Sequence, residues 1–421
     1  MIKVVHVTAH LGGGIGKILS SVAIFSKDRC EVEHIIIALE QTQTTQFEKL
    51  CRGHNIKVLL ATKCDIECIL NQADIVQLDW WHHPLTSEFM AKYLNKIKCR
   101  LLVWSHISGC SYPYISPKAV LFPDAYVFTT PYSYENRFWS DKEREEIIGK
   151  SYVVISSGLD FDKPIEKKKH SGFNVGYIGF LGYNKMHPNF VKYCEGASDI
   201  PNVKFNVVGE TSFGKQLLVD VYNSKLVKDK IIFEGYSLNV LNNLAEFDVF
   251  GYPLNPNHYG TAENVLLEAM AAGIVPVVLN QCTEKYIVKN MKTGLLVNNI
   301  SEYANALRWL YENPIKRNIL AVNASEFIIK DYCIKSTVEK MNKVYYEVLK
   351  MNKHIHDADP IIGKEPYEWF LSCYKGNENK LEGNAFAETK GSAKHYLKYF
   401  SEDKKLRKVV EKNESRIKTI L

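Results

Sequence analysis

The stretch HYGTAENVLLEAMAAGIVPVV, residues His258–Val278, joins a helix-length segment directly to a β-branched run. Gly273 is the residue type that commonly ends a helix, because glycine adopts the left-handed conformation without strain. The pattern therefore predicts a helix over Ala262–Ala272 and a strand over Ile274–Asn280. Glu268 lies in the second turn of this otherwise apolar helix, where its two carboxylate oxygens can accept hydrogen bonds from a vicinal diol such as that of a ribose.

Short β-branched runs alternate with helix-length segments over most of the chain, which is typical of a parallel, doubly wound sheet. A first set of expected strands covers residues 2–9, 33–40, 56–61, 73–79, 100–106, 125–130 and 152–158. A second set covers residues 174–180, 203–210, 230–236, 247–253, 274–280 and 294–299. The sequence after residue 301 has a helical pattern.

The segment Leu159–Phe173 interrupts this alternation with a proline and a basic run, as a linker does. We therefore expect two α/β domains, residues 1–165 and 166–335, facing a cleft. Residues 336–421 are expected to form a helical extension that packs back on the first domain.

The composition is that of an ordinary soluble globular protein, with 46% hydrophobic and 24% charged residues. The net charge of +6 is compatible with anionic ligands and too small to favour nucleic acid. MIKVVHVTAH predicts a first strand rather than a signal peptide, and no run of about 18 apolar residues occurs, so we expect a cytoplasmic protein. Cys64 and Cys68 lie one helical turn apart without a second pair, so they predict no metal site.

Two glycine-rich loops follow expected strands. Gly12, Gly13 and Gly14 fit neither a Walker A loop nor a dinucleotide-binding fingerprint, but they allow close backbone approach to an anion at a helix N-terminus. In VGYIGFLGYNK, Gly179 frees the backbone and Lys185 can reach a phosphate. The alternatives are a plain tight turn and a solvated surface lysine.

These segments, together with ENVLLEAMAAGIVPVV and EKYIVKNMKTGLLV, resemble the retaining GT-B glycosyltransferases of family four (glycosyl transferases group 1) over about residues 1–350. The resemblance implies two Rossmann-like domains and transfer of a sugar from a nucleotide-sugar donor with retention of configuration. It matches Glu268 to the glutamate that binds the ribose, Lys185 to the lysine that neutralises the diphosphate, and Gly12–Gly14 to the loop against the donor.

The chain departs from the family pattern at two positions. Gly260 stands eight residues before Glu268, where the family has a first glutamate that contacts the donor sugar, and Phe180 stands where an arginine is common. The missing carboxylate's role can pass to His258, to Glu263 or to backbone amides. The expected donor-binding residues of this segment are His258, Gly260, Thr261, Ala262, Glu263, Asn264, Val265 and Glu268.

Three histidines follow strands of the first domain. His106 matches a family histidine that contacts the reacting sugar, so we group it with Lys185 and Glu268 as a catalytic candidate. His82 and His83 are expected to contact the acceptor rather than to catalyse. For each of them the alternative is a polar core or surface residue.

The resemblance implies a metal-independent reaction with no cofactor beyond the nucleotide sugar, and a glycan or lipid-linked acceptor in surface polysaccharide biosynthesis. A non-catalytic nucleotide- or glycan-binding protein and a sugar-nucleotide epimerase are the alternative functions. The tail Ser401–Leu421 carries seven basic and four acidic residues around an apolar stripe. It can contact a membrane peripherally, pack on its own chain or form a homodimer. The stripe consists of Leu406, Val410, Ile417 and Ile420.

Overall fold

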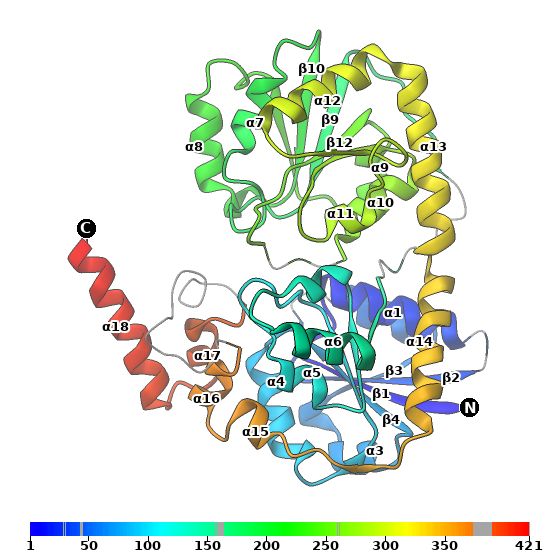
Figure 1. The fold of residues 1–421 in the computed structure, drawn as a ribbon, viewed down its shortest axis with the longest axis vertical. Helices are drawn as coiled ribbons and strands as arrows, with labels where there is room; N and C mark the ends of the chain where they lie inside the picture. Colours follow the sequence, from blue (N-terminus) through cyan, green and yellow to red (C-terminus); the bar gives the residue numbers. More distant parts are fainter. Residues whose placement is uncertain are drawn as a thin grey trace. The chain divides into compact units, whose positions relative to one another are not determined.

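The computed structural model describes residues 1–27, 29, 31–42, 45–155, 158, 164–258, 260, 262–373 and 390–420, with the backbone alone for 413–420. The chain divides into two compact units (Figure 1). Unit 1 comprises Met1–Gly158 and Thr337–Leu421, and unit 2 comprises Leu159–Ser336. Among the described residues, no helix is both long enough and apolar enough to cross a membrane.

Unit 1 is built on a seven-stranded sheet in the order β3-β2-β1-β4-β6-β7-β8, and every neighbouring pair is parallel. β1 (Ile2–Thr8) lies near the centre, and five of its seven residues are buried because helices cover both faces. The other strands are β2 (Val32–Ala38), β3 (Lys57–Leu60), β4 (Ile75–Trp80), β6 (Leu101–Ser105), β7 (Ala125–Phe128) and β8 (Ser151–Val153).

The helices of unit 1 that precede residue 158 connect these strands. They are α1 (Gly13–Lys27), α2 (Gln46–Gly53), α3 (Ile66–Asn71), α4 (Pro84–Phe89), α5 (Pro117–Leu121) and α6 (Asp141–Lys150). Short 3-10 or π turns cover Ala61–Lys63, Met90–Leu94 and Pro131–Glu135. Side-chain caps fix several helix starts: Ser140, for example, begins α6 with a capping box to Glu143.

The C-terminal segment returns to unit 1 through α14 (Ile334–Leu349) and adds a short strand to it. β15 (His354–Ile355) pairs antiparallel with β5 (Lys98–Cys99). α15, α16 and α17 follow, and α16 and α17 pack beside α4 (Figure 1). Their bounds are Asp359–Ile362, Pro366–Leu371 and Ala393–Tyr399.

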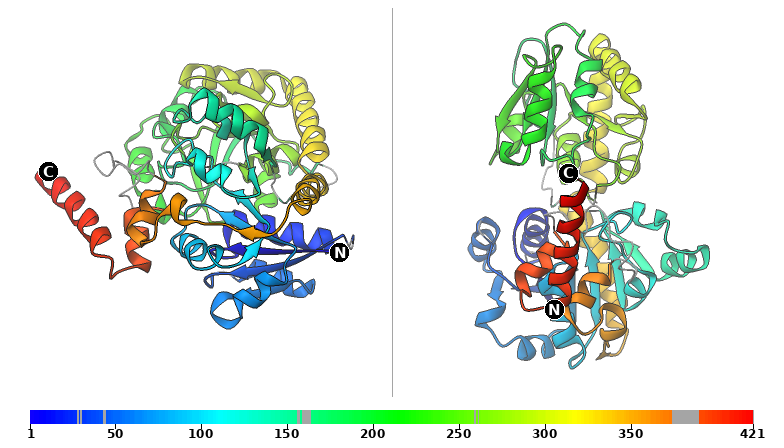
Figure 2. Two further views of the ribbon diagram at one scale, coloured as in Figure 1. Left: turned by 60° about the horizontal axis from the view of Figure 1, so that its bottom comes forward. Right: turned by 90° about the vertical axis from the view of Figure 1, so that its left-hand side faces the viewer.

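α18 (Lys404–Ile420) projects from the body of unit 1 beyond α17, as Figure 2 shows. The first half of its apolar stripe packs on its own chain: Leu406 is fully buried in the unit 1 core and Val410 is nearly so. The side chains of Ile417 and Ile420 lie outside the described residues. The structure therefore accounts for the stripe around Leu406 by packing, while membrane contact and dimerisation stay predictions.

Unit 2 contains a six-stranded parallel sheet in the order β11-β10-β9-β12-β13-β14. The strands are β9 (Phe173–Ile178), β10 (Val203–Val208), β11 (Ile231–Gly235), β12 (Val249–Tyr252), β13 (Val275–Leu279) and β14 (Leu295–Val297). The helices are α7 (Phe190–Gly196), α8 (Lys215–Asn223), α9 (Val240–Leu244), α10 (Asn264–Ala271), α11 (Glu284–Ile287), α12 (Ile300–Glu312) and α13 (Pro314–Asp331), with a 3-10 turn at Thr211–Phe213.

All thirteen expected strands are present, and their ends differ by at most two residues except in β8, which ends at Val153 although the strand was expected to reach residue 158. The expected helix over 262–272 is also present, but α10 begins at Asn264 because Glu263 adopts a left-handed conformation with φ 43°. Gly273 ends this helix with φ 77°, as predicted. α13 packs against α10, and its Ser325 hydroxyl donates to the Ala271 carbonyl at 2.7 Å.

Candidate functional site

In unit 2 the loop after β9 holds Lys185 in a fixed position. The Gly179 amide donates to the Val208 carbonyl at 3.0 Å, which ties the loop to the end of β10. The Lys185 amide donates to the Gly182 carbonyl at 2.9 Å, and the Lys185 carbonyl accepts from the Asn255 amide at 2.8 Å. The backbone of Lys185 is therefore held from both sides at the carboxyl ends of the strands, where open α/β sheets bind ligands.

The Lys185 ammonium forms an ion pair with Glu263. Its Nζ lies 2.6 and 2.7 Å from the two carboxylate oxygens, and the side chains are 16% and 1% exposed. The Tyr252 hydroxyl donates to the same carboxylate at 3.0 Å. Burial alone would raise the pKa of Glu263, but the Lys185 charge outweighs it and lowers this pKa below its ordinary value. The Glu263 carboxylate is therefore ionised, and it forms a charge-assisted, hydrogen-bonded pair with Lys185 at the start of α10.

Glu263 occupies the space beside Gly260. A side chain at position 260 would overlap the Glu263 carboxylate, and its Cβ would lie 2.5 Å from the Lys185 ammonium nitrogen. The left-handed conformation of Glu263 costs about 1–2 kcal/mol for a residue with a Cβ. Its contacts with Lys185 and Tyr252 hold it in that conformation. The Glu263 carboxylate therefore fills the space that the side chain of any larger residue at position 260 would enter.

His258 lies between two buried carboxylates. Its Nδ1 accepts from the Gly260 amide at 3.0 Å and lies 3.7 Å from Glu263, while its Nε2 lies 3.6 Å from Glu284. Glu284 is fully buried, and neither of its oxygens has a hydrogen-bond partner among the described residues. A buried carboxylate is costly unless it is paired, so Glu284 is a candidate ligand-binding group.

His258, Cys282 and Glu284 lie close enough to share a metal ion. The hydrogen bonding does not favour this use. The Gly260 amide donates to His258 Nδ1, so the ring proton of a neutral imidazole is on Nε2, the atom that faces Glu284. The Cys282 thiol donates to the Pro256 carbonyl at 3.2 Å. A metal at His258 Nε2 would have to displace the ring proton, so we assign no metal to this group.

The remaining predicted donor residues of unit 2 surround this pair along the start of α10. Ala262 is buried, Asn264 begins α10, and Val265 follows it; Thr261 lies outside the described residues. Glu268 lies in the second turn of α10 and is 8% exposed. Phe180 packs against Phe213, with ring centroids 5.0 Å apart and ring planes tilted by 36°, and supplies no charge.

In unit 1, a buried carboxylate orients His106. Asp79 is the penultimate residue of β4. Its carboxylate lies 3.1 Å from His106 Nε2 and 3.4 Å from His6 Nδ1. Burial alone would raise the pKa of Asp79, but the hydrogen bonds from His106 and His6 lower it. Asp79 is therefore an anion that accepts the Nε2 proton of His106, which leaves Nδ1 as the basic nitrogen of that ring.

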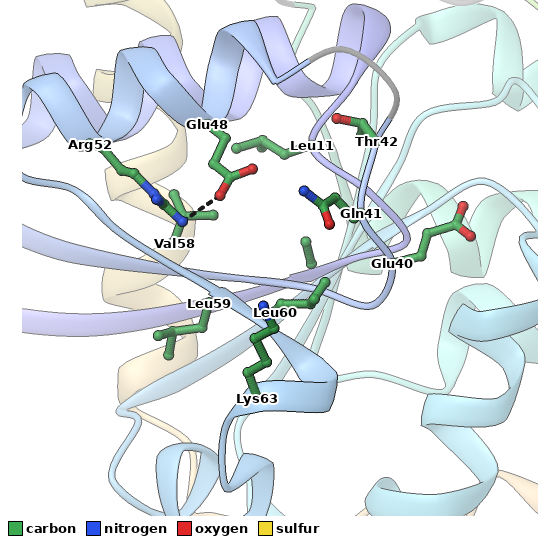
Figure 3. A pocket seen from close by; sticks show the side chains of 11 residues that line it. Leu11, Glu40, Gln41, Thr42, Glu48, Arg52, Val58, Leu59, Leu60 and Lys63 are labelled. Carbon is green, nitrogen blue, oxygen red and sulfur yellow. Dashed lines mark hydrogen bonds and ion pairs between the residues drawn. The ribbon is translucent and has the colours of Figure 1, made fainter.

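The first glycine loop and a neighbouring pocket lie at the same carboxyl ends of the unit 1 strands. α1 begins at Gly13, which has φ 59°; a Cβ on Gly12 would contact Thr42 and His10. A cavity of about 240 Å³ opens beside Thr42. Figure 3 shows its lining, in which Glu48 and Arg52 form an ion pair at 2.5 Å. The other polar side chains of the lining are Glu40, Gln41 and Lys63.

The rings of His82 and His83 are buried, and their expected contact with the acceptor stays a prediction. His82 is fully buried against Tyr396 of α17, with ring centroids 5.2 Å apart. His83 Nδ1 accepts from the Leu85 amide at 3.2 Å and caps α4. Its Nε2 lies 3.4 Å from Glu40. Both residues therefore have structural contacts: His82 packs against the C-terminal extension, and His83 caps α4.

Replacing His82 is expected to reduce the loss in free energy of unfolding that occurs when the pH is lowered. Burial lowers the pKa of His82 to about 3, whereas an unfolded histidine titrates near pH 6.5. The unfolded chain therefore binds the proton first, and stability falls as the pH drops below about 6.5. One such residue removes roughly 2 kcal/mol between pH 7 and 5.

His82→Asn tests this, because asparagine tolerates the φ of 59° at this position. Urea unfolding at pH 7 and 5 should show a smaller loss of stability in the variant than in the wild type. His54→Asn, at an exposed histidine, serves as the matched control. An equal loss in the wild type and in His82→Asn would contradict the prediction.

The sequence interpretation missed Asp79, Tyr252 and Glu284. Asp79 is the last residue of the expected strand 73–79, just as His106 is the last residue of 100–106, so its position at a strand end was an available signal. Tyr252 also ends its strand, but tyrosine is common in cores and gives no separate signal. Glu284 becomes recognisable as a site residue only when its complete burial beside His258 is known.

Comparison with known proteins gives matches of three kinds. Residues 160–327 match the family model of glycosyl transferases group 1. Over 232 residues, the chain is 24% identical to the UDP-Gal:alpha-D-GlcNAc-diphosphoundecaprenol alpha-1,3-galactosyltransferase of Escherichia coli. That match covers 50% of this chain and spans 59% of the relative's length.

Solved structures show the same architecture. Anabaena Alr3699/HepE in complex with UDP and glucose has a TM-score of 0.63 at 14% identity, over 82% of this chain and 100% of that one. A glycosyltransferase from Rickettsia africae ESF-5 has a TM-score of 0.64 at 15% identity, over 83% and 99% of the two chains. With the two parallel sheets, these likenesses show a GT-B fold of two Rossmann-like domains with a helical C-terminal part.

Proposed function

We propose that this chain is a glycosyltransferase that takes a sugar from a nucleotide-sugar donor and transfers it to a hydroxyl acceptor with retention of configuration. The observation that carries the proposal is the Lys185–Glu263 pair at the start of α10, one turn before Glu268. The family match over residues 160–327 contains all three residues. Cationic and diol-binding groups within one domain suit a nucleoside diphosphate sugar.

Lys185 and the first amides of α10 would stabilise the diphosphate as the sugar leaves it. An ammonium has three N–H donors, and the described contacts use two of them on Glu263. The third donor is then available to a phosphate oxygen. Charge stabilisation of a leaving group by fixed donors commonly supplies several kcal/mol of barrier lowering.

Glu263 would take the role of the first family glutamate. Its carboxylate fills the space next to Gly260, the position at which the family carries that residue. Tyr252 and Lys185 fix two sides of the carboxylate, so it can accept a hydrogen bond from a sugar hydroxyl in a defined orientation. A carboxylate at position 263 instead of 260 would thus keep an acidic group beside the donor. This argues against a purely non-catalytic protein.

The transfer would proceed at the front face of the sugar, with the leaving phosphate accepting the acceptor's proton. This step requires no general base and no metal. His106 would orient the reacting sugar, and Asp79 would keep its ring in one tautomer. We assign Gly12–Gly14 to the donor as well, because glycines at a helix start allow close approach of a phosphate or sugar.

The relatives point to a uridine nucleotide and a lipid-linked or glycan acceptor. The Escherichia coli relative is named for UDP-Gal and a diphosphoundecaprenol acceptor, and the Anabaena structure contains UDP and glucose. The pocket beside Thr42 provides a place in unit 1 for the acceptor's polar groups. We extend the proposal to surface polysaccharide biosynthesis at the cytoplasmic side, with or without peripheral membrane contact.

A panel of nucleotide sugars tests the donor assignment by thermal shift, since a ligand that binds the folded state raises its melting temperature. We expect a uridine nucleotide sugar to give the largest shift. Glu268→Ala should weaken this binding by about 1–3 kcal/mol, the range for a lost hydrogen bond to a charged group. A folded Glu268→Ala protein with wild-type affinity would contradict the assignment of Glu268.

A further inference from the structure

A second group of potential metal ligands lies in unit 1, apart from the proposed donor groups. His356 Nε2 lies 3.1 Å from Asp124 Oδ2, and His354 Nδ1 lies 3.7 Å from Asp124 Oδ1. The two imidazole rings are 4.1 Å apart. One ligand atom from each of the three residues lies within 4.8 Å of the others.

The local fold brings these side chains together. His354 begins the two-residue strand β15 and His356 directly follows it. In extended backbone, residues two apart point to the same side, and the two rings lie with centroids 4.1 Å apart. β15 pairs with β5, and the His356 amide donates to the Leu94 carbonyl at 3.2 Å. Asp124 immediately precedes β7, and its Oδ2 accepts from the Leu101 amide at 2.7 Å. Backbone contacts therefore hold the groups in place.

We propose that Asp124, His354 and His356 bind a zinc ion, or a similar borderline divalent metal, as a structural site. Two imidazoles and a carboxylate are ligands that zinc takes at about 2.0–2.2 Å, and a water completes a tetrahedron. Ligand atoms of such a site lie about 3.2–3.5 Å apart. The present ligand atoms, which lie within 4.8 Å of one another, would move closer together, and the metal would replace the contact of His354 Nδ1 with the Asn352 carbonyl at 3.3 Å. An all-oxygen ion such as Mg²⁺ is disfavoured by the two imidazoles.

The environment of the three residues suits a metal that is open to solvent on one side. His356 and Asp124 have side chains only 1% and 6% exposed, whereas that of His354 is 54% exposed. The exposed ring leaves an entry path and room for a bound water. His356 Nδ1 lies 3.8 Å from the Cys99 sulfur, which can accept a hydrogen bond from Nδ1–H when Nε2 binds the metal.

The position of the site indicates a structural role. Asp124 and Leu101 lie at the amino ends of β7 and β6, whereas His106 follows the carboxyl end of β6. Five residues of strand place the two ends roughly 16 Å apart. A metal here would fasten the segment after α14 to the body of unit 1. It would not contact the reacting groups, so it is compatible with a metal-independent transfer.

Zinc binding to the full-length, tag-free and chelator-treated protein tests this proposal. We expect one zinc ion per chain by equilibrium dialysis, a rise in melting temperature with zinc, and a tetrahedral visible spectrum with Co²⁺. His354→Ala should leave the metal-free melting temperature near that of the wild type, because this ring is exposed. It should weaken zinc binding at least about tenfold, which is ~1.4 kcal/mol.

Two further variants make the outcome decisive. Asp124→Asn keeps an oxygen for the Leu101 amide but removes the charge, and should also weaken zinc binding. His170→Ala is the matched control, since His170 pairs with Asp248 at 3.6 Å in unit 2, outside both three-residue groups. It should bind zinc as the wild type does. Absence of zinc binding, or binding that His354→Ala and Asp124→Asn leave unchanged, would overturn the proposal.

Discussion

Lys185→Ala is expected to lower turnover by about two to three orders of magnitude, the effect of removing one fixed donor from a developing negative charge. The same change leaves the nearly fully buried Glu263 carboxylate without its cation. An unpaired buried charge of this kind costs about 3–5 kcal/mol, so the variant should also be less stable. Initial rates at saturating donor and a urea unfolding curve measure the two effects separately.

The double variant Lys185→Met with Glu263→Gln separates catalysis from folding. The glutamine amide oxygen can still accept from the Tyr252 hydroxyl, and no unpaired charge remains. We expect its stability to return toward that of the wild type while its turnover stays low. Turnover that recovers together with stability would assign Lys185 a purely structural role.

Gly260→Ala is expected to impair donor binding although it adds only one methyl group. The new Cβ would overlap the Glu263 carboxylate and lie 2.8 Å from His258 Nδ1, so the ion pair with Lys185 must move. Overpacking of this kind costs about 1–3 kcal/mol, and we expect donor affinity to fall by about tenfold or more. Calorimetric titration with the best nucleotide sugar measures the change.

Two further variants show whether a loss of donor affinity in Gly260→Ala comes from the space beside residue 260. Gly149→Ala in α6 is the control, because a Cβ there meets nothing within 4 Å. Gly260→Glu with Glu263→Gly moves the carboxylate to the position that the family uses, and it should bind the donor better than Gly260→Ala. Wild-type affinity in Gly260→Ala would show that the space beside residue 260 is not part of the donor site.

The strand pattern was predictable because each buried parallel strand is a short β-branched run, and this signal is local. The runs at 33–40 and 274–280 correspond to β2 and β13 with small differences at the ends. Family-type spacing likewise singled out Lys185 and Glu268. Patterns of this kind can be recognised in a single sequence because they depend on residues that are close along the chain.

The sequence left open which group replaces the carboxylate missing at 260, and our proposal that Glu263 does so comes from the structure. It depends on a left-handed backbone at Glu263 and on a partner, Lys185, that lies 78 residues away. Local propensity disfavours that conformation, so only tertiary contacts reveal it. The burial of His82 could not be predicted for a similar reason, since His82 packs against Tyr396 of the extension, far along the chain.

A ¹H NMR time course with donor and acceptor shows whether the protein transfers a sugar out of a nucleotide sugar. We predict that nucleoside diphosphate appears in step with a new glycoside whose anomeric configuration matches that of the donor, with only slow hydrolysis when the acceptor is omitted. A donor that binds but stays unchanged under all conditions would instead indicate a binding protein. Conversion of the donor into a different sugar nucleotide, without release of diphosphate, would contradict the account in favour of an epimerase.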